Sequence, residues 1–242
     1  MHKRIPVTSD SIRCSTCMLG DLCLPLGMSQ RDRQVLDEII KERIRLPKGG
    51  SLFQAGDAVA AVYGIRSGSI KTQLEDAAGQ VQITGFLLPG EIVGLDGLLQ
   101  LRQASHAVAL ETTEVCVIRL DEMDGLAPHL PSLQQQFRRL LSKEISRSQQ
   151  MTATLALLRS EQRVAAFLLN VSQRLAALGY SAEAFVLRMS RADIGNYLGL
   201  TLETVSRWLS RFARDGLIQL RQREVTLLQP QALQQLAGTA CD

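Results

Sequence analysis

Three cysteines near the amino terminus are the residues of this chain best suited to chemistry. The stretch CSTCMLGDLC places Cys14, Cys17 and Cys23 within ten positions, in a C-x2-C-x5-C spacing. Three thiols make an incomplete metal site, or one disulfide with a thiol left over. Two more cysteines, Cys116 and Cys241, lie far along the chain. The spacing therefore raises the question of which residue supplies a fourth ligand.

Composition and the amino-terminal segment indicate where such a site would work. The segment MHKRIPVTSDS has a basic start without a following apolar stretch, so we expect no secretory signal. No apolar run is long enough to cross a membrane, and we expect no membrane partner. In a reducing cytoplasm clustered cysteines bind metals or act in redox chemistry more often than they form structural disulfides. With 45% apolar and 21% charged residues the chain is an ordinary globular protein, and its net charge of +3 does not by itself argue for nucleic acid.

The segments that would position the cysteines change character along the chain. Residues 1–30 are irregular, and a short helix is predicted at about 29–43 with Ser29 as its N-cap. From about 44 to 120, runs rich in β-branched residues alternate with glycine, which predicts an antiparallel β-roll or barrel. DAAG at 76–79 is typical of a hairpin turn. Strict alternation in the strand TTEVCVIRL places Cys116 and Ile118 on one face.

A long amphipathic helix is predicted from about 131 to 158, after a short helix and a turn in DEMDGLAPHLPSL. Its apolar residues follow four-residue steps and the stripe loosens near Ser148. Such a helix is either buried in a core or forms a seam that joins two chains. The residues that we expect at this seam are Phe137, Leu141, Ile145, Ser148, Met151 and Leu155.

The last 80 residues have the pattern of a DNA reader. Ser190 can cap a first short helix, Gly199 ends it, and Thr201 can cap a second helix, followed by the strands LIQLRQ and EVTLLQP. Between positions 188 and 224 there are seven arginines and four acidic residues, a local excess that suits phosphate contacts. The alternative is a solvated helical hairpin with ordinary surface charge. The outward face of the second helix carries Glu203, Ser206, Arg207 and Arg211.

From about residue 14 to 238 the chain resembles the CRP/FNR superfamily of bacterial transcription regulators, and within it the FNR-type oxygen sensors, including the Anr group. The order of β-roll, long helix and helix-turn-helix with a small wing carries the resemblance. The cysteine spacing and ETVSR are specific to the FNR branch. The matching stretches are CSTCMLGDLCLPL, LFQAGD, VYGIRSGSIKT, QITGFLLPGEIVGLD, ALETTEVCVI and IGNYLGLTLETVSRWLSRF.

The resemblance implies an α+β fold, in which a sensor β-roll like that of cyclic-nucleotide-binding domains precedes a dimerisation helix and a C-terminal winged helix-turn-helix. We expect a cysteine segment at 1–28, the β-roll at 29–125, the dimerisation helix at 126–158 and the DNA-binding domain at 159–242. The expected protein is a regulator, not an enzyme. It would act in low oxygen on genes of anaerobic metabolism.

The resemblance also implies the ligands and partners. Cys14, Cys17, Cys23 and Cys116 would bind an oxygen-labile [4Fe-4S] cluster, and the loaded form would be a homodimer on double-stranded DNA. Positions that read bases in the family are occupied here by Glu203, Ser206 and Arg207, to which we add Thr201 and Arg211 as DNA-binding residues. The implied target resembles the palindrome TTGAT-N4-ATCAA. Surface loops such as the 75–80 hairpin would contact RNA polymerase.

The chemistry of the fourth ligand favours Cys116. Alone, a cysteine on a strand is more often a small buried hydrophobe. Cys241 lies one residue from the C-terminus, where fraying is expected. A zinc site usually takes two short-spaced pairs, whereas the four irons of a cubane each need one thiolate and tolerate widely spread ligands. Zinc and a redox disulfide remain the alternatives.

We expect the cluster to tie the amino terminus to the β-roll. Its loss in oxygen should weaken the pairing of the long helices, and the two recognition helices should then lose the half-site spacing of ~34 Å that a palindrome requires.

Single residues argue against three rival functions. A cyclic-nucleotide-responsive regulator needs an Arg followed by Ser or Thr to grip the cyclic phosphate, but these positions fall at Gln103 and Ala104, and Arg102 is one residue off. A haem sensor would need a residue that binds the haem iron. The three histidines, His2, His106 and His129, are explained without a haem, as solvated or core residues. An iron–sulfur enzyme is disfavoured because the sequence offers no nucleotide loop and no base–nucleophile set.

Overall fold

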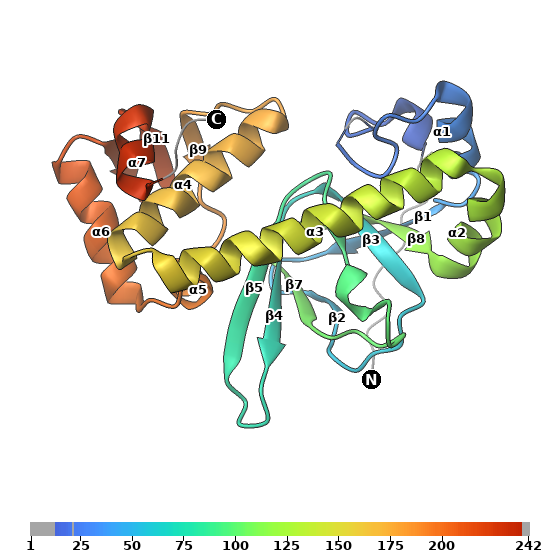
Figure 1. The fold of residues 1–242 in the computed structure, drawn as a ribbon, viewed down its shortest axis with the longest axis horizontal. Helices are drawn as coiled ribbons and strands as arrows, with labels where there is room; N and C mark the ends of the chain where they lie inside the picture. Colours follow the sequence, from blue (N-terminus) through green and yellow to red (C-terminus); the bar gives the residue numbers. More distant parts are fainter. Residues whose placement is uncertain (1–12, 21, 239–242) are drawn as a thin grey trace. The chain divides into compact units, whose positions relative to one another are not determined.

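The computed structural model describes residues 13–20 and 22–238. The chain forms two compact units whose boundary falls between Ile145 and Ser146 (Figure 1). This boundary lies inside the long helix α3 (Pro131–Leu157), so each unit contains part of it. The finer division into four segments stays a prediction.

Two antiparallel sheets form the β-roll of the first unit (Figure 1). One has the order β1-β8-β3-β6, with β1 (Glu42–Leu46), β8 (Thr113–Arg119), β3 (Ala61–Ser67) and β6 (Ile92–Val93). The other has the order β2-β7-β4-β5, with β2 (Ser51–Phe53), β7 (His106–Ala109), β4 (Ile70–Glu75) and β5 (Val81–Leu87). A core that includes Leu46, Ile65 and Ile70 is fully buried within the roll. The predicted β-roll is confirmed.

The hairpin between β4 and β5 turns at the predicted place. The Asp76 carboxylate accepts hydrogen bonds from the backbone N–H groups of Ala78 and Gln80 at 2.9 and 2.8 Å. Gly79 has φ +77°, which a side chain would disfavour. An Asx-type turn of this kind fixes the register of the two strands.

Helices α1 (Gln30–Asp37), α2 (Leu120–Leu126) and the start of α3 share one apolar core. Ser29 caps α1 as predicted, since its side chain accepts from the Asp32 N–H. The predicted helix at 29–43 is too long, because α1 ends at Asp37 and the strand β1 begins at Glu42. Ile40 is buried with Leu36 in the same core, so its apolar character continues the helical pattern although the chain has left the helix.

The second unit is a winged helix-turn-helix. It contains α4 (Ser160–Ala177), α5 (Arg191–Leu198), α6 (Leu202–Arg214) and α7 (Pro230–Ala237). Its sheet has the order β10-β11-β9, with β10 (Ile218–Arg221), β11 (Glu224–Leu227) and β9 (Ala184–Val186). The strand β9 was not predicted, because three residues give too short a pattern. Gly179 follows α4 with φ +81°, as its predicted role at the helix end requires.

Candidate metal centre and nucleic-acid interface

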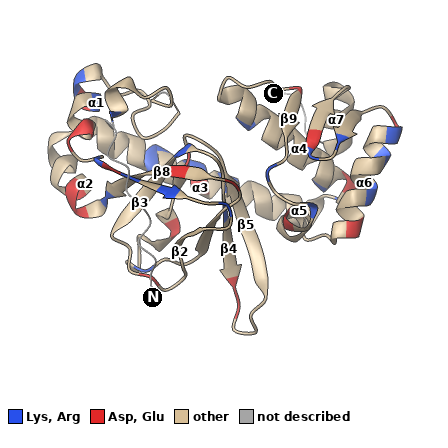
Figure 2. Ribbon diagram, turned by 180° about the vertical axis from the view of Figure 1, so that it is seen from behind, with Lys and Arg blue, Asp and Glu red and all other residues tan. Residues whose placement is uncertain are grey.

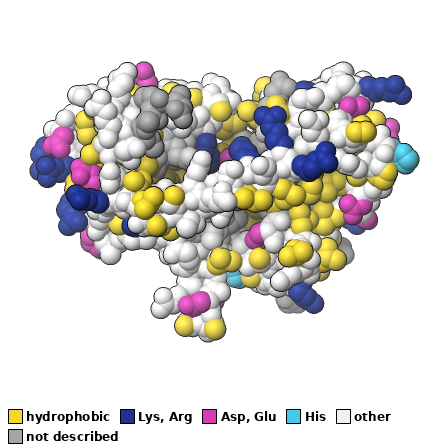
Figure 3. Space-filling model, in the orientation of Figure 1, with side chains coloured by type: hydrophobic (Ala, Val, Ile, Leu, Met, Phe, Trp, Pro, Cys, Tyr) yellow, Lys and Arg dark blue, Asp and Glu magenta, His cyan; other side chains and the backbone are white. Residues whose placement is uncertain are grey.

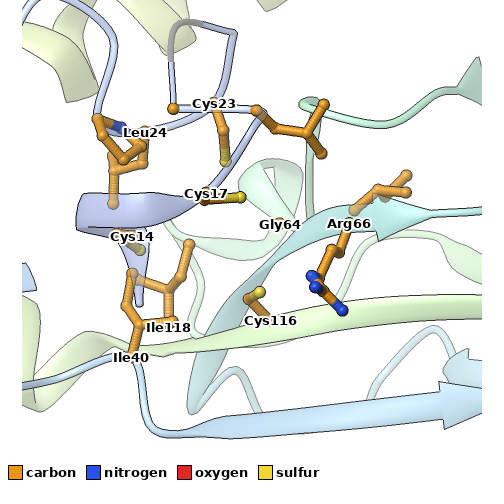
Figure 4. Close-up of a pocket in the computed structure, with 13 residues that line it drawn as sticks. Cys14, Cys17, Cys23, Leu24, Ile40, Gly64, Arg66, Cys116 and Ile118 are labelled. Atoms are coloured by element: carbon orange, nitrogen blue, oxygen red, sulfur yellow. The ribbon is translucent and has the colours of Figure 1, made fainter. Parts of the chain in front are cut away.

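Four cysteines line one pocket of the first unit (Figure 4). Cys14 belongs to the short 3-10 helix η1 (Cys14–Thr16), Cys17 and Cys23 to the loop after it, and Cys116 to β8. The structure thus brings together all four residues predicted as ligands. Most of the remaining lining is apolar, and Arg66 supplies a charged group: the other lining residues are Leu19, Gly20, Leu24, Pro25, Ile40, Gly64, Ile65, Arg66 and Ile118.

The cysteine loop is fastened to α1 through Ser15. The Asp37 carboxylate accepts two hydrogen bonds from Ser15, one from its N–H at 3.1 Å and one from its hydroxyl at 2.5 Å. The Gln30 side-chain amide donates to the Ser15 carbonyl at 3.3 Å. Further along, Leu24 and Met28 are buried in the core that α1 and α3 share. Polar contacts therefore fix the loop at Cys14 and Cys17, and apolar burial fixes it after Cys23.

Cys116 is presented from the middle of a sheet. In the strand register Cys116 lies opposite Arg43 of β1 and Gly64 of β3. As predicted, Cys116 and Ile118 face the core that contains the cysteine loop, while Val115 belongs to the core of the roll. A Cβ added at Gly64 would lie 3.4 Å from the Cys23 sulfur. The missing side chain of this glycine leaves room between the loop and Cys116.

The thiols lie in each other's electrostatic field. Burial raises the pKa of Cys23 to about 12, although the Leu24 N–H lowers it in part. Burial also raises the pKa of Cys14, and the charges of Cys23 and Cys116 add to the effect. The pKa of Cys116 is raised by burial and lowered in part by Arg43. These three thiols are protonated at neutral pH, and a metal that binds thiolates must displace their protons.

The four thiols of the pocket are the donor type that an iron–sulfur group requires. Within residues 13–20 and 22–238, no three His, Cys, Asp or Glu side chains are grouped closely enough to hold one metal ion. A zinc ion requires all its thiolates at about 2.3 Å from one centre. A cubane binds each thiolate to a different iron, so its ligands are spread around the group. Four thiols that line one largely apolar pocket supply the number of thiolates that such a group requires.

The helix-turn-helix is built as its sequence predicts. Ser190 accepts a hydrogen bond from the Asp193 N–H and Thr201 accepts one from the Thr204 N–H, so both helices begin at the expected caps. Gly199 ends α5 in the left-handed region with φ +63°. A Cβ at Gly195 would lie 2.7 Å from the Leu200 carbonyl oxygen, so the tight turn requires a glycine there. These features set the angle at which α6 leaves the turn.

The predicted DNA-binding residues lie on α6 or cap it, and Figure 2 shows the basic residues along this helix. Glu203 and Arg207 are exposed, and the pKa of Glu203 is lowered by its own backbone N–H and by the Thr201 hydroxyl. Arg211 forms an ion pair with Asp215 at 3.3 Å.

Two contacts of α6 were not found from the sequence. Ser206 is half-buried and accepts a hydrogen bond from Arg191 at 3.3 Å, whereas the sequence indicates for Arg191 only a contribution to the local positive charge. The Trp208 indole donates to the Ser160 hydroxyl at 3.0 Å and so joins α6 to α4. Side-chain pairs so far apart in sequence leave no periodic signal.

The residues predicted for the dimer seam have different surroundings. Phe137 is half-buried and packs against the core beside the cysteine loop. Leu141, Met151 and Leu155 are half-buried, whereas Ser148 is exposed and Ile145 is 59% exposed. Figure 3 shows exposed hydrophobic side chains beside the first-unit part of α3. The early part of the stripe thus serves the monomer core, and Ile145 faces solvent in the single chain.

The position expected to grip a cyclic phosphate carries no positive charge. Gln103 is 3% exposed and lies against Gly94, and its side-chain oxygen has no hydrogen-bond partner among the described residues. Arg102 donates instead to the Gly56 carbonyl at 2.9 Å. Arg102 lies outside the strands, in an isolated bridge with Ala58, so its direction is set by the loop at Gly56 and not by the strand alternation that the sequence suggested. Among the described residues no helix is long and apolar enough to cross a membrane.

Comparison with known proteins gives the family. The cyclic nucleotide-binding domain matches residues 43–128, and the Crp-like helix-turn-helix domain matches residues 162–236. The chain is 61% identical over 238 residues to the transcriptional regulatory protein btr of Bordetella pertussis, with 98% of each chain covered. It is 47% identical over 225 residues to the transcriptional activator protein anr of Pseudomonas aeruginosa, with 93% of this chain and 92% of that protein covered.

A third relative and a solved structure support the same family. The fumarate and nitrate reduction regulatory protein of Yersinia pestis is 42% identical over 236 residues, covering 98% of this chain and 94% of that protein. The structure of FixK2 from Bradyrhizobium japonicum superimposes with a TM-score of 0.74 at 28% identity, covering 83% of this chain and 98% of that one. The predicted fold class is confirmed, and these relatives are regulators rather than enzymes. The chain belongs to the CRP/FNR superfamily of DNA-binding transcription regulators, in its FNR-type branch.

Proposed function

We propose that this protein is an oxygen-responsive transcription regulator that holds a [4Fe-4S] cluster and binds DNA when oxygen is low. The observation that carries the proposal is that Cys116, on a central strand, lines the same pocket as Cys14, Cys17 and Cys23. The printed names of several relatives, such as the anaerobic regulatory protein of Haemophilus influenzae, support a role in anaerobic metabolism.

The four thiolates would hold the group between the amino-terminal loop and the β-roll. When bound, it supplies a redox centre that oxygen oxidises. The protein contributes an apolar pocket that limits water, and a loop whose position depends on Ser15 and Asp37. Because burial raises the pKa of Cys14, Cys23 and Cys116, these thiols are protonated when metal-free, and empty and loaded states differ in charge and in packing at the loop.

The loop is coupled to α3 through a shared core. Leu24 and Met28 of the loop region lie in the same apolar cluster as Leu133 of α3, and Phe137 packs against it. Asp32 of α1 also accepts a hydrogen bond from Ser132 at the start of α3, at 2.8 Å. A change in the loop therefore alters the support of the helix that we propose as the dimerisation element, along the seam from Phe137 to Leu155.

In the proposed homodimer two copies of α6 would read a palindrome resembling TTGAT-N4-ATCAA. Arg207 can donate to guanine, Glu203 can accept from cytosine, and Ser206 can contact either base or phosphate. Pairing of the long helices would hold the recognition helices about one helical turn of DNA apart, ~34 Å. The β4–β5 hairpin around residues 75–80 would offer a contact for RNA polymerase.

An anaerobic reconstitution tests the proposal. Iron and sulfide assays with visible absorbance should show a cluster that air removes, and sedimentation should show more dimer in the loaded form. Fluorescence anisotropy should show palindrome binding by that form only. A protein that binds zinc alone, or that has the same monomer–dimer equilibrium with and without oxygen, would refute the respective step.

A further inference from the structure

Two arginines lie beside Cys116 and share one carboxylate. Glu114 precedes Cys116 by two residues and therefore lies on the same face of β8. Its carboxylate forms an ion pair with Arg43 at 3.3 Å. Each of its two oxygens also accepts a hydrogen bond from Nη1 of Arg66, at 3.2 Å for Oε1 and 3.1 Å for Oε2. Two positive charges and one negative charge leave a net positive charge next to the strand-borne thiol.

Arg43 is an unusual residue for this position, because it is almost completely buried. Its side chain is 9% exposed, and its Nε–H has no hydrogen-bond partner within the described part of the chain. In the sheet register it lies directly opposite Cys116. A buried guanidinium with an unpaired donor is costly, and a single carboxylate shared with Arg66 offsets this cost only in part.

Arg66 reaches the pocket itself. It is one of the residues that line the pocket, and Figure 4 shows its guanidinium directed toward Cys116. Its side chain is 42% exposed, so it connects the pocket with solvent. Both arginines lower the pKa of Cys116 against the effect of burial, which agrees with their placement around the sulfur.

We propose that Arg43 and Arg66, joined by Glu114, are positioning residues that act through Cys116 and set how readily the bound iron–sulfur group is oxidised. The inference rests on the proposed function. Four thiolates contribute four negative charges, more than the positive charge of the inorganic core, so the loaded site is negative. Nearby positive charge stabilises the more negative, reduced state and raises the reduction potential. The electron lost on oxidation goes to dioxygen, which is reduced to superoxide.

The test compares substitutions of opposite charge at one ion pair, all in the full-length protein. Arg66→Gln should lower the reduction potential and speed the loss of the visible band in air by about threefold to tenfold, a range limited by the solvent exposure of Arg66. Arg66→Lys keeps the charge and should stay near wild type. Glu114→Gln removes negative charge and should raise the potential and slow the loss.

Arg119→Gln is the matched control. Arg119 lies on the same strand, faces the other side, is 44% exposed and pairs with Asp121 at 3.4 Å. It should leave the potential and the lifetime in air unchanged. Thermal unfolding of the metal-free proteins reports whether each variant folds, and iron and sulfide content reports loading.

The sign of the two shifts decides between charge and structure. If the ion pair matters only for packing, Arg66→Gln and Glu114→Gln both break it and shift the potential in the same direction, which overturns the inference. Unchanged potentials in all variants overturn it as well. If the wild type itself binds no iron and sulfide, the proposed function fails, and this outcome is distinct from both.

Discussion

Replacement of Asp37 by alanine should release the amino-terminal end of the cysteine loop. Asp37 is the last residue of α1, and its carboxylate accepts hydrogen bonds from the N–H and the hydroxyl of Ser15 at 3.1 and 2.5 Å. Ser15 lies between Cys14 and Cys17, so these two bonds hold both thiols in place against the pocket. Without the carboxylate, this end of the loop keeps only the contact from Gln30 to the Ser15 carbonyl among its side-chain hydrogen bonds in the described structure.

The size of the effect follows from the two bonds. A hydrogen bond to a charged group contributes about 1.5–3 kcal/mol, but both bonds are only partly buried and water replaces them after the substitution. We expect a combined loss of about 2 kcal/mol, which corresponds to an about thirtyfold lower ratio of ordered to released loop. An opposing effect exists, because the Asp37 charge contributes to the raised pKa of Cys14. It ranks below burial and the charges of Cys23 and Cys116, so the loss of order should dominate.

Anaerobic iron and sulfide titration measures this prediction. Asp37→Ala should need more iron for half-loading, by up to about thirtyfold, or load at a correspondingly lower rate. Asp37→Asn keeps an acceptor oxygen and should lose less. Glu38→Ala removes the neighbouring carboxylate, which is exposed, and should behave as wild type. Loading of Asp37→Ala equal to that of wild type would refute the role of the Ser15 contact.

Further predictions concern the ligands, the proton balance and the DNA reader. Cys116→Ala should abolish iron and sulfide binding and anaerobic DNA binding as completely as Cys17→Ala, while Cys241→Ala should change neither assay; Cys241 lies outside the described residues. Because burial raises the pKa of the thiols of Cys14, Cys23 and Cys116, loading should release protons, and apparent iron affinity should increase as pH rises through the neutral range in a pH-stat titration. Arg207→Ala should weaken binding to the palindrome by about 1–3 kcal/mol in anisotropy and relax selectivity for one base pair. Gly195→Ala should lower the free energy of unfolding by about 2 kcal/mol in denaturant titration, since its Cβ would lie 2.7 Å from a backbone oxygen in the turn.

The sequence predicted the start of a helix correctly wherever a side chain accepts a hydrogen bond from the backbone of a nearby residue. Ser29, Ser190 and Thr201 each cap the helix that they were expected to begin, because the capping bond needs only residues two or three positions away. The predicted helix at 29–43 failed for the opposite reason. Ile40 is apolar because it fills a core shared by the loop, α1 and α3, and such tertiary burial produces the same pattern as a longer helix.

The sequence predicted the four cysteines that line the pocket, but not the residues that surround and hold them. Spacing located three thiols, and strand alternation placed Cys116 on a definite face. Which neighbours stand around that face depends on strand register, which brings Arg43 opposite Cys116. The contacts of Glu114 with Arg66 and of Ser15 with Asp37 join residues that carry no recognisable motif, so only the folded chain reveals them.

The two ends of the proposed site differ in how firmly the fold holds them, and this difference explains why the fourth ligand belongs on a strand. Cys116 is paired on both sides, with β1 and with β3, so it moves only if the sheet opens. The loop is held by the Ser15 contacts and by burial of Leu24 and Met28, each worth about 1.5–3 kcal/mol. The backbone and side-chain entropy lost when the loop is ordered opposes these contacts and lowers the net preference for the docked loop. Allosteric couplings are typically 1–3 kcal/mol, and a group that bridges loop and strand needs to supply no more than this to shift the equilibrium. Four thiols on the loop alone would order only the loop, whereas a strand-borne ligand draws the loop onto the core that also supports α3.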